Sequence, residues 1–528
     1  MNLIKDKWLP VVRADGKDDI IAPWQIAEKD NPVLELKAPR PDFQGALYQF
    51  LIGLLQTCFA PEDHDDWLEY WEEMPDADKL NTSFMNIAPA FVLDNTNGPA
   101  FMQDIDLGKG EEKAIAALLM EFPGGKTLKD NTDHFIKRNT VNKMCYGCAA
   151  TALFTLQINA PSGGRGHRVS LRGGGPVTTL VRPAQASTLW QKLWLNVLDA
   201  ESFTASVSVL SSDVFPWMAD TRTSEKKGSE TRPADVHKLQ VYWGMPRRIR
   251  LKFNHETDGG CDICRAKDKQ LVTKYSTRKY GVNYEGEWIH PLTPYLFDKK
   301  KEKPPISIKG RRGRISYQHW LGLVLSDTAK GDSAAKVVRQ YLEERARDIN
   351  GSYLPVLWAF GYDMDNMKAR CWYDHTMPLF KLDKNQQNNM MGWVSELIES
   401  ARDTAEALKS QVKAAWFSGP KDSKGDMSFV SIPFWRESEN MFYQLLERLS
   451  QLPGSQRQAP PELYDTWLKS IRSLAYRLFD EWVLESPAED LDMKRVTAAR
   501  LKLQKQLYAS KIMKSLADKA KPEKEDEQ

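Results

Sequence analysis

Two Cys-x-x-Cys pairs constrain the fold of this chain more than any other feature of its sequence. The first pair is Cys145-Tyr-Gly-Cys148, and the second is Cys261-Asp-Ile-Cys264. Two thiolates at this spacing can bind one tetrahedral metal ion, and two such pairs complete a four-sulfur shell. We therefore predict that two distant segments converge on a structural zinc ion. The alternative is that one pair is accidental and its thiols are buried, because a free cysteine behaves as a small hydrophobic residue.

The length and composition of the chain indicate a globular protein of several domains. Its 528 residues suffice for a large buried core, which we expect to be divided among about two to four domains. Hydrophobic residues make up 41% and charged residues 27%, as in ordinary soluble proteins. The 73 basic and 71 acidic side chains nearly cancel. Any affinity for nucleic acid would therefore have to come from local basic patches.

We find no targeting or membrane-spanning signal in the sequence. The first residues lack the apolar core of a signal peptide. The longest apolar stretch, 47–60, is interrupted by Gln49 and Gln56 and is too short to span a bilayer. We therefore expect a cytoplasmic protein without membrane contact. In a reducing compartment, paired cysteines favour a metal ion over a disulfide.

The apolar pattern divides the chain into two parts. From Met390 onward, apolar residues recur at helical spacing in four segments separated by Gly and Pro, and the fourth segment covers about 490–520. We predict an α+β domain over 1–380, an all-α antiparallel four-helix bundle over 381–520, and a disordered tail over 521–528. In the α+β domain, the predicted elements are a strand at Trp8–Val12, helices at Phe43–Phe59 and Trp67–Met74, a hairpin or loop-linked strands at Ile87–Met102, helices at Ala114–Phe122 and Cys145–Leu156, and a strand at Val177–Val181.

A run of glycine and arginine follows the first cysteine pair, over 162–175. One interpretation is a set of tight turns, because glycine permits positive φ. The other is close approach of the backbone to a duplex groove, with Arg165, Arg168 and Arg172 contacting phosphates or the groove. Composition alone does not decide between the two.

Three further basic clusters favour a polyanionic partner, although each could be ordinary solvated surface. They are Lys299–Arg314, the group Arg247, Arg248 and Arg250, and the last helix, which carries Lys494, Arg495, Arg500, Lys502, Lys505, Lys511 and Lys514. The sequence Gly124-Gly125-Lys126-Thr127 is not a P-loop, because Met120 stands where that motif needs glycine. We find no hydrolase or deaminase motif either. The chain is therefore predicted not to be an enzyme.

An ordered set of sequence segments resembles the large subunit of the type I-E CRISPR Cascade surveillance complex, the CasA family. The resemblance covers nearly the whole chain. Besides the cysteine pairs, the segments are Met1-Asn2-Leu3, Trp8-Leu9-Pro10-Val11, Pro99-Ala100-Phe101-Met102-Gln103, Leu171-Arg172-Gly173-Gly174, Trp288-Ile289-His290-Pro291 and Phe434-Trp435-Arg436-Glu437-Ser438-Glu439.

The resemblance implies a non-catalytic DNA-binding subunit with a zinc site and a C-terminal bundle. Such a subunit recognises the short PAM (protospacer-adjacent motif) in duplex DNA from the minor groove. It then helps open the duplex for the guide RNA and recruits a helicase-nuclease for antiviral defence. The implied partners are double-stranded DNA, CRISPR RNA, the other Cascade subunits and the helicase-nuclease, with one copy in a hetero-oligomer. Two rivals remain, namely a scaffold subunit with incidental DNA contact and a zinc-dependent nucleic-acid enzyme.

The resemblance also implies which residues contact DNA. A glycine loop in the PAM minor groove corresponds to Ser162, Gly163, Gly164, Arg165 and Gly166, with Arg165 in place of a glycine. A lysine finger corresponds to Lys279, a wedge to Asn366 or Met367, and the aromatic of a long loop over 127–143 to Phe135. The predicted backbone contacts are Lys137, Arg138, Arg168, Lys309, Arg311, Arg312, Arg314, Lys502 and Lys505.

Overall fold

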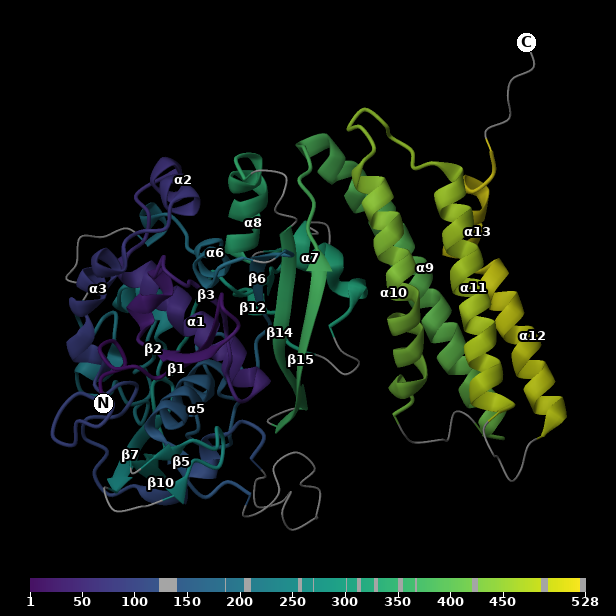
Figure 1. Ribbon diagram of the computed structural model, residues 1–528. Coiled ribbons are helices and arrows are strands. Elements are labelled where there is room, and N and C mark those ends of the chain that lie inside the picture. The colour runs from purple at the N-terminus through teal and green to yellow at the C-terminus, as the bar shows by residue number, and fades with distance from the viewer. Residues whose placement is uncertain are drawn as a thin grey trace. The chain divides into compact units, whose positions relative to one another are not determined.

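The computed structural model describes residues 1–122, 140–185, 187–203, 210–254, 259–268, 270–300, 302–310, 315–326, 331–349, 355–365, 368–419, 426–485 and 492–522 (Figure 1). The chain forms two compact units. Unit 1 is Met1–Gly310 with Gly331–Thr376, and unit 2 is Arg311–Lys330 with Met377–Gln528. The described residues 315–326 belong to the helical unit, although they precede the boundary expected near 380.

The core of unit 1 forms around helix α1 (Pro41–Cys58), which is buried on nearly all sides (Figure 1). Apolar residues occupy every face of this helix, so that it can lie inside a core. Helix α5 (Tyr146–Asn159) packs against it and is equally apolar. Both helices confirm the predictions for these segments. The ring of Phe50 makes edge contacts, at centroid distances of 5.5 to 6.0 Å, with Trp8, Phe91, Phe101, Phe154 and Trp243.

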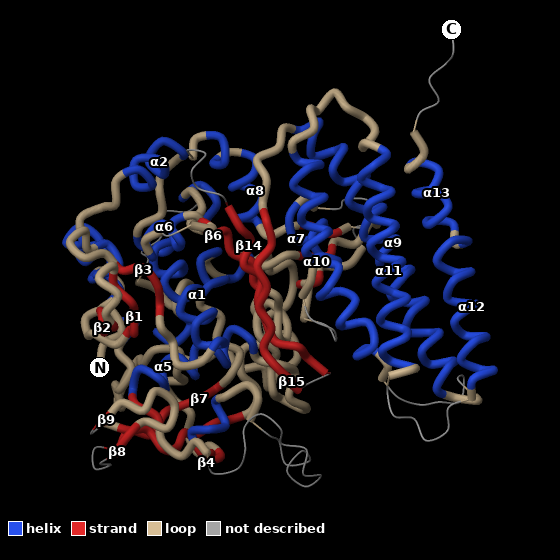
Figure 2. The backbone as a smooth tube through the Cα atoms, turned by 45° about the vertical axis from the view of Figure 1, so that its right-hand side comes forward, coloured by secondary structure: helices blue, strands red, loops and turns tan. Residues whose placement is uncertain are grey.

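The strands of unit 1 form several small sheets, coloured red in Figure 2. The sheet that matters most for the site is centred on β10 (Leu271–Arg278), which pairs antiparallel with β7 (Arg248–Asn254), β4 (Glu111–Ala114) and β5 (Met144–Cys145). The other sheets are β2 (Asp18–Ile21), β1 (Leu9–Arg13) and β3 (Val33–Leu36); β15 (Lys368–Pro378), β14 (Pro355–Asp365) and β6 (Thr178–Pro183); β12 (Ile306–Ser307), β11 (Tyr295–Leu296) and β13 (Asp332–Ser333); and β8 (Gly259–Gly260) with β9 (Lys267–Asp268).

Two predicted elements of unit 1 are wrong. The segment 87–102 contains a 3-10 helix at Ala88–Phe91 and isolated bridges in place of a hairpin, because proline in its first turn favours a helical start. The segment 114–122 is not an α-helix, since β4 ends at Ala114 and a 3-10 helix follows at Ile115–Leu118. Only Ala114 pairs with β10, and the alanines and leucines that follow form a single 3-10 turn in spite of their helix propensity. The remaining α-helices in the described part of the unit are α2 (His64–Glu72), α3 (Ala77–Met85), α6 (Leu189–Trp194) and α8 (Lys336–Glu343).

Unit 2 is a helical bundle centred on α9 (Lys384–Trp416). This helix packs against α10 (Ser428–Ser450), α11 (Pro461–Val483), α12 (Met493–Ala509) and α13 (Lys511–Lys519). The predicted fourth helix is divided, because Ser510 is extended and caps α13 by accepting a hydrogen bond from the N–H of Met513. The ring of Tyr317 lies 4.3 Å from that of Phe442, which ties the segment 315–326 to the bundle. The helices are α7 (Trp320–Val324), α9 (Lys384–Trp416), α10 (Ser428–Ser450), α11 (Pro461–Val483), α12 (Met493–Ala509) and α13 (Lys511–Lys519). None of the helices in the described ranges is both long and apolar enough to cross a membrane.

Candidate metal centre and nucleic-acid interface

The first cysteine pair lies where a short strand becomes a helix. Cys145 ends β5, pairs there with Leu271 of β10, and is also the N-cap of α5. Its sulfur accepts a hydrogen bond from the backbone N–H of Cys148 at 3.5 Å, where a Ser or Asp oxygen usually serves. Cys148 is buried in the first turn of the helix. A helix N-terminus favours negative charge, so this position suits thiolate groups.

The second cysteine pair lies in the turn between β8 and β9. The N–H of Cys261 donates to the carbonyl of Ala266 at 2.9 Å, and the N–H of Arg265 donates to the carbonyl of Cys261 at 2.9 Å. Asp262, inside the pair, accepts hydrogen bonds from the N–H groups of Asn142 at 2.7 Å and Lys143 at 3.0 Å. These bonds tie the turn to the segment that leads into the first pair.

The structure brings the four sulfur atoms together, as the spacing predicts. They all lie within 4.8 Å of one another, and the sulfurs of Cys145 and Cys264 are 3.7 Å apart. The close Cys145 group raises the pKa of Cys148, because neighbouring thiols cannot all ionise by themselves. It lowers the pKa of Cys264 to about 7, because a hydrogen bond between the two sulfurs stabilises the Cys264 thiolate. A bound cation would remove this conflict. The cluster can therefore hold a metal ion.

The glycine loop, defined here as residues 162–166, forms an exposed turn close after α5. The N–H of His167 donates to the carbonyl of Gly164 at 3.1 Å. Gly164 and Gly166 have φ of +85° and +80°, which side chains with a Cβ rarely adopt. A Cβ on Gly163 would lie 2.7 Å from the Cβ of His167. The tight-turn interpretation is therefore correct, and the same turn leaves the backbone of its outer residues exposed.

The glycine loop lies beside Lys279, although the two are far apart in the sequence. The N–H of Tyr280 donates to the carbonyl of Gly166 at 2.7 Å, and a Cβ on Gly166 would lie 2.9 Å from the Cβ of Lys279. Lys279 is exposed and follows the last residue of β10. Tyr280 has a φ of +63° and was not singled out from the sequence. No sequence signal marks it, because a left-handed tyrosine is uncommon.

The structure contradicts a groove contact for Arg172. This side chain is only 5% exposed. Its guanidinium donates to the side chains of Gln49 at 2.8 Å, Thr293 at 3.0 Å and Thr178 at 3.1 Å. Burial lowers its pKa to about 10. Arg172 is therefore a core residue, a role that the glycine-arginine composition conceals.

The other predicted arginines of this region differ in how freely they face solvent. Arg165 is exposed, whereas Arg168 is half-buried and donates to the hydroxyl of Ser224 at 2.6 Å. Arg248 is buried against Asp104 at 2.5 Å. Arg250 donates to backbone carbonyl groups, including that of Gly98 at 3.1 Å. The expectation that Arg248 and Arg250 contribute to a polyanion surface is therefore wrong.

Several predicted contacts lie outside the described residues, namely Phe135, Lys137, Arg138, Arg311, Arg312, Arg314, Asn366 and Met367. The strands on either side of the predicted wedge are described. Asp363 of β14 accepts a hydrogen bond from Arg370 of β15 at 2.5 Å, which joins the two strands close to that position. Lys309 is exposed and forms an isolated bridge with Pro176.

On the bundle, the predicted contacts Lys502 and Lys505 are exposed on α12. Within the described ranges, no carboxylate lies at ion-pair distance from either lysine. The arginines of the same helix are engaged, since Arg495 donates to the carbonyl of Ala415 at 2.7 Å and Arg500 pairs with Asp480 at 2.8 Å. The lysines therefore carry the charge that α12 can offer to a phosphate backbone.

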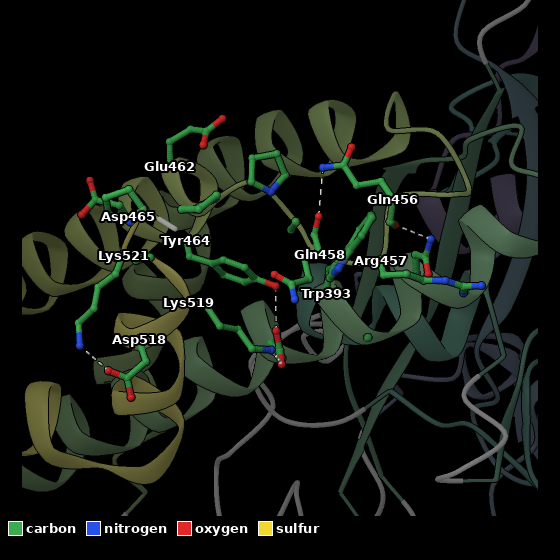
Figure 3. Close-up of a pocket in the computed structure, with 18 of the residues that line it drawn as sticks. Trp393, Gln456, Arg457, Gln458, Glu462, Tyr464, Asp465, Asp518, Lys519 and Lys521 are labelled. Carbon is green, nitrogen blue, oxygen red and sulfur yellow. Dashed lines mark hydrogen bonds and ion pairs between the residues drawn. The ribbon is translucent and has the colours of Figure 1, made fainter. Parts of the chain in front are cut away.

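A pocket of about 1540 Å³ lies within unit 2, between α9, the segment that joins α10 to α11, and the end of α13 (Figure 3). Lys519 forms an ion pair with Glu396, which also accepts a hydrogen bond from the hydroxyl of Tyr464 at 3.0 Å. Lys521 pairs with Asp518 at 2.8 Å. These charges neutralise one another, and we assign no chemistry to this pocket.

Comparisons with known proteins agree over nearly the whole chain. The model of the family "CRISPR-associated protein Cse1" matches residues 2–478. CasA from Thermus thermophilus matches with a TM-score of 0.67 at 16% identity, over 96% of this chain and 99% of that chain. Cse1 from Acidimicrobium ferrooxidans matches with a TM-score of 0.67 at 15% identity, over 99% of each chain. A chain of a CRISPR RNA-guided surveillance complex matches with a TM-score of 0.66 at 14% identity, over 96% of this chain and 99% of that chain. At these identities the solved structures establish a shared fold.

Proposed function

Because the chain belongs to the Cse1 family of CRISPR-associated proteins, the large subunit of the type I-E Cascade surveillance complex, we propose that it reads the PAM of duplex DNA from the minor groove. The observation that carries this proposal is the contact between the exposed glycine loop and Lys279, joined by the hydrogen bond from Tyr280 to Gly166 at 2.7 Å. A narrow turn with bare backbone can enter a groove that bulky side chains cannot. The lysine beside it would supply a positive charge for base acceptors or phosphates.

Minor-groove contacts of this kind give a loose sequence preference, because A·T and T·A pairs present similar acceptors there. PAM binding would then nucleate pairing between the guide RNA and the target strand, an exchange of nearly balanced energy. A wedge at 366–367, which lies between β14 and β15 in the sequence, would need to offset only the free energy of unstacking the first base step. The exposed lysines of α12 would hold displaced or flanking DNA through its phosphates.

We propose that the four-cysteine cluster binds zinc in a structural role. Zinc–sulfur bonds of about 2.3 Å in a tetrahedron give sulfur–sulfur distances of about 3.8 Å, and the sulfurs of Cys145 and Cys264 are 3.7 Å apart. Cys145, Cys148, Cys261 and Cys264 would complete the shell and leave no open position for water, so zinc would supply no catalysis. Since β5 pairs with the start of β10, the ion would fix the strand that ends next to Lys279.

The partners follow from the same proposal. The chain would work inside a prokaryotic cell as one copy in a complex with CRISPR RNA and other Cascade subunits. After duplex opening it would recruit the helicase-nuclease and would itself perform no chemistry.

The test is Lys279→Ala in the full chain assembled with its partner subunits and guide RNA. We expect binding to a PAM-bearing duplex, selected from a library with randomised flanks, to weaken about tenfold, the cost of one good base contact. Binding to a bubble that is already open should change little. Lys274→Ala is the matched control, since Lys274 is exposed on β10, the strand that Lys279 follows, but pairs with Glu112 at 2.7 Å. Equal losses on both substrates would remove the PAM role, and no loss on either would favour a scaffold.

A further inference from the structure

Arg247 bridges the two ends of the glycine loop. Its Nη2 donates to the carbonyl of Pro161, which precedes the loop, and its Nη1 lies 2.8 Å from Nδ1 of His167, which follows it. The N–H of Gly163 also donates to the carbonyl of His167, at 3.4 Å. The guanidinium therefore closes the base of the turn, while the outer residues remain exposed.

The position of Arg247 is itself fixed from the core. Its backbone N–H donates to the side-chain oxygen of Gln157 at 2.9 Å, and the amide nitrogen of Gln157 donates to the carbonyl of Arg247 at 3.0 Å. Gln157 is fully buried in α5, the helix that begins at the first cysteine pair. The bridge thus connects the loop to the buried helix α5.

Arg247 makes this bridge without an acidic partner. In the described part of the chain, no carboxylate pairs with it, whereas the neighbouring Arg248 pairs with Asp104. Its Nε is buried without a hydrogen-bond partner, and burial lowers its pKa to about 10. A partly buried cation without an acid lowers stability. In the described part of the chain, its hydrogen bonds go to the residues that flank the loop and to Gln157 of α5, which points to a role in shaping the loop.

We propose that Arg247 is a positioning residue that holds the glycine loop in its groove-reading shape, and that it does so only while His167 is neutral. Neutral His167 with its proton on Nε2 can accept the hydrogen bond at Nδ1. Protonated His167 cannot accept, and it would place a second cation 2.8 Å from the guanidinium. The inference rests on the function proposed for the loop.

The charged groups that face His167 support the neutral form. Arg247, Lys113 of β4 and Lys279 after β10 are cations, and Glu111 of β4 is the opposing acid. Burial and then these cations lower the pKa of His167 below its ordinary value of 6.5. The bridge is therefore complete at neutral pH and is lost only as the pH falls through that lowered pKa.

The first test is Arg247→Met in the full chain, because methionine fills similar space but cannot donate. Without DNA, amide hydrogen exchange over 162–168 should become about tenfold faster, since a hydrogen bond from a charged group is lost. In the assembled complex, the affinity for a PAM-bearing duplex should fall about tenfold, while binding to an open bubble and the metal content stay unchanged. Unchanged exchange and unchanged affinity would overturn the proposal.

The second test separates positioning from general stability by changing His167. His167→Asn keeps an acceptor near the place of Nδ1 but does not titrate, so it should bind as the native chain does near neutral pH. It should also lack the additional loss of affinity that the native chain shows as the pH falls from neutral through the pKa of His167, which lies below the ordinary value of 6.5. His167→Phe removes the acceptor and should behave like Arg247→Met. Identical pH profiles for the native chain and His167→Asn would overturn the role of His167.

The two measurements distinguish failure of this inference from failure of the proposed function. Hydrogen exchange reports the bridge without DNA. If the native chain failed to discriminate PAM-bearing from other duplexes, the proposed function would fail, and the exchange data would still decide whether Arg247 holds the loop.

Discussion

The glycine loop and helix α12 are both basic in sequence, but they offer different things to a nucleic acid. Around the loop, the guanidinium groups of Arg168, Arg172 and Arg247 bond to the protein itself. On α12, the lysines Lys502 and Lys505 face solvent. Arginine carries five donors in a fixed fork and readily serves internal acceptors, whereas lysine is strongly hydrated and remains at the surface. We infer that the loop reads shape through its backbone and one lysine, and that α12 supplies sequence-independent attraction.

Metal removal should have the largest effect and should separate the two regions most clearly. Cys148→Ser, or chelation, is expected to destabilise unit 1, because structural zinc sites contribute about 10 kcal/mol or more to folding. The helical signal of the bundle should persist in circular dichroism while PAM-duplex binding is lost. Metal analysis of the native chain should return one zinc per chain. Unchanged melting of unit 1 after complete metal loss would contradict a structural ion.

Arg172→Leu should have the next largest effect and should act on stability. The change removes the donor to the hydroxyls of Thr178 and Thr293, whereas the oxygen of Gln49 still accepts from the hydroxyl of Thr178 at 3.3 Å. Each buried unsatisfied group costs about 1 kcal/mol or more, so we expect a loss of about 2 kcal/mol in the stability of unit 1, measured by chemical denaturation. Arg165→Ala, a few residues away and exposed, is the control and should leave stability unchanged. Equal stability of the two variants would contradict the stabilising role assigned to Arg172 in the core.

The double variant Lys502→Ala with Lys505→Ala should change the salt dependence of binding. The slope of log affinity against log salt is negative, and each lost phosphate contact makes it less steep by about 0.9. We therefore expect a slope that is less steep by about 2, while PAM discrimination stays intact. Lys469→Ala is the control, because Lys469 is exposed on α11 but pairs with Asp465 at 2.7 Å. An unchanged slope would remove α12 from the path of the DNA.

Arg165→Gly should have the smallest effect. It removes one exposed charge from the glycine loop without altering the turn, so that the affinity for every duplex should fall only a few-fold. The slope of log affinity against log salt should become less steep by about 0.9, as for the loss of one phosphate contact. A loss of affinity for the PAM-bearing duplex alone would show instead that Arg165 contacts bases. The loop would then recognise DNA through a side chain as well as through its backbone.

The helices and the metal cluster could be predicted from the sequence because their signals are local or strongly constrained. Long apolar runs define α1 and α5, periodic apolar residues define the bundle helices, and Cys-x-x-Cys spacing restricts each pair to one geometry. The convergence of the two pairs could be predicted because one tetrahedral ion needs four ligands and each pair supplies two. The break at Ser510 was missed, although a serine in a long helical pattern is a possible cap.

The roles of individual basic residues could not be predicted, because they depend on partners far away in sequence. Arg172 meets Gln49 and Thr293 only in the folded chain. Arg247 meets His167 across the glycine loop in the same way. Composition showed arginine beside glycine and did not decide between a set of tight turns and approach to a duplex groove, and it gave no sign that an arginine there is buried. Only the tertiary structure separates the two.

Base analogues in the PAM test most directly whether this chain reads DNA from the minor groove. Inosine in place of guanine removes the minor-groove amino group, and 2,6-diaminopurine in place of adenine adds one, whereas 7-deazapurines alter only the major groove. We expect the affinity of the assembled complex to follow the minor-groove changes, to be indifferent to the deaza bases, and to lose this sensitivity in Lys279→Ala. Sensitivity to the deaza bases alone would contradict the role assigned to the glycine loop and Lys279.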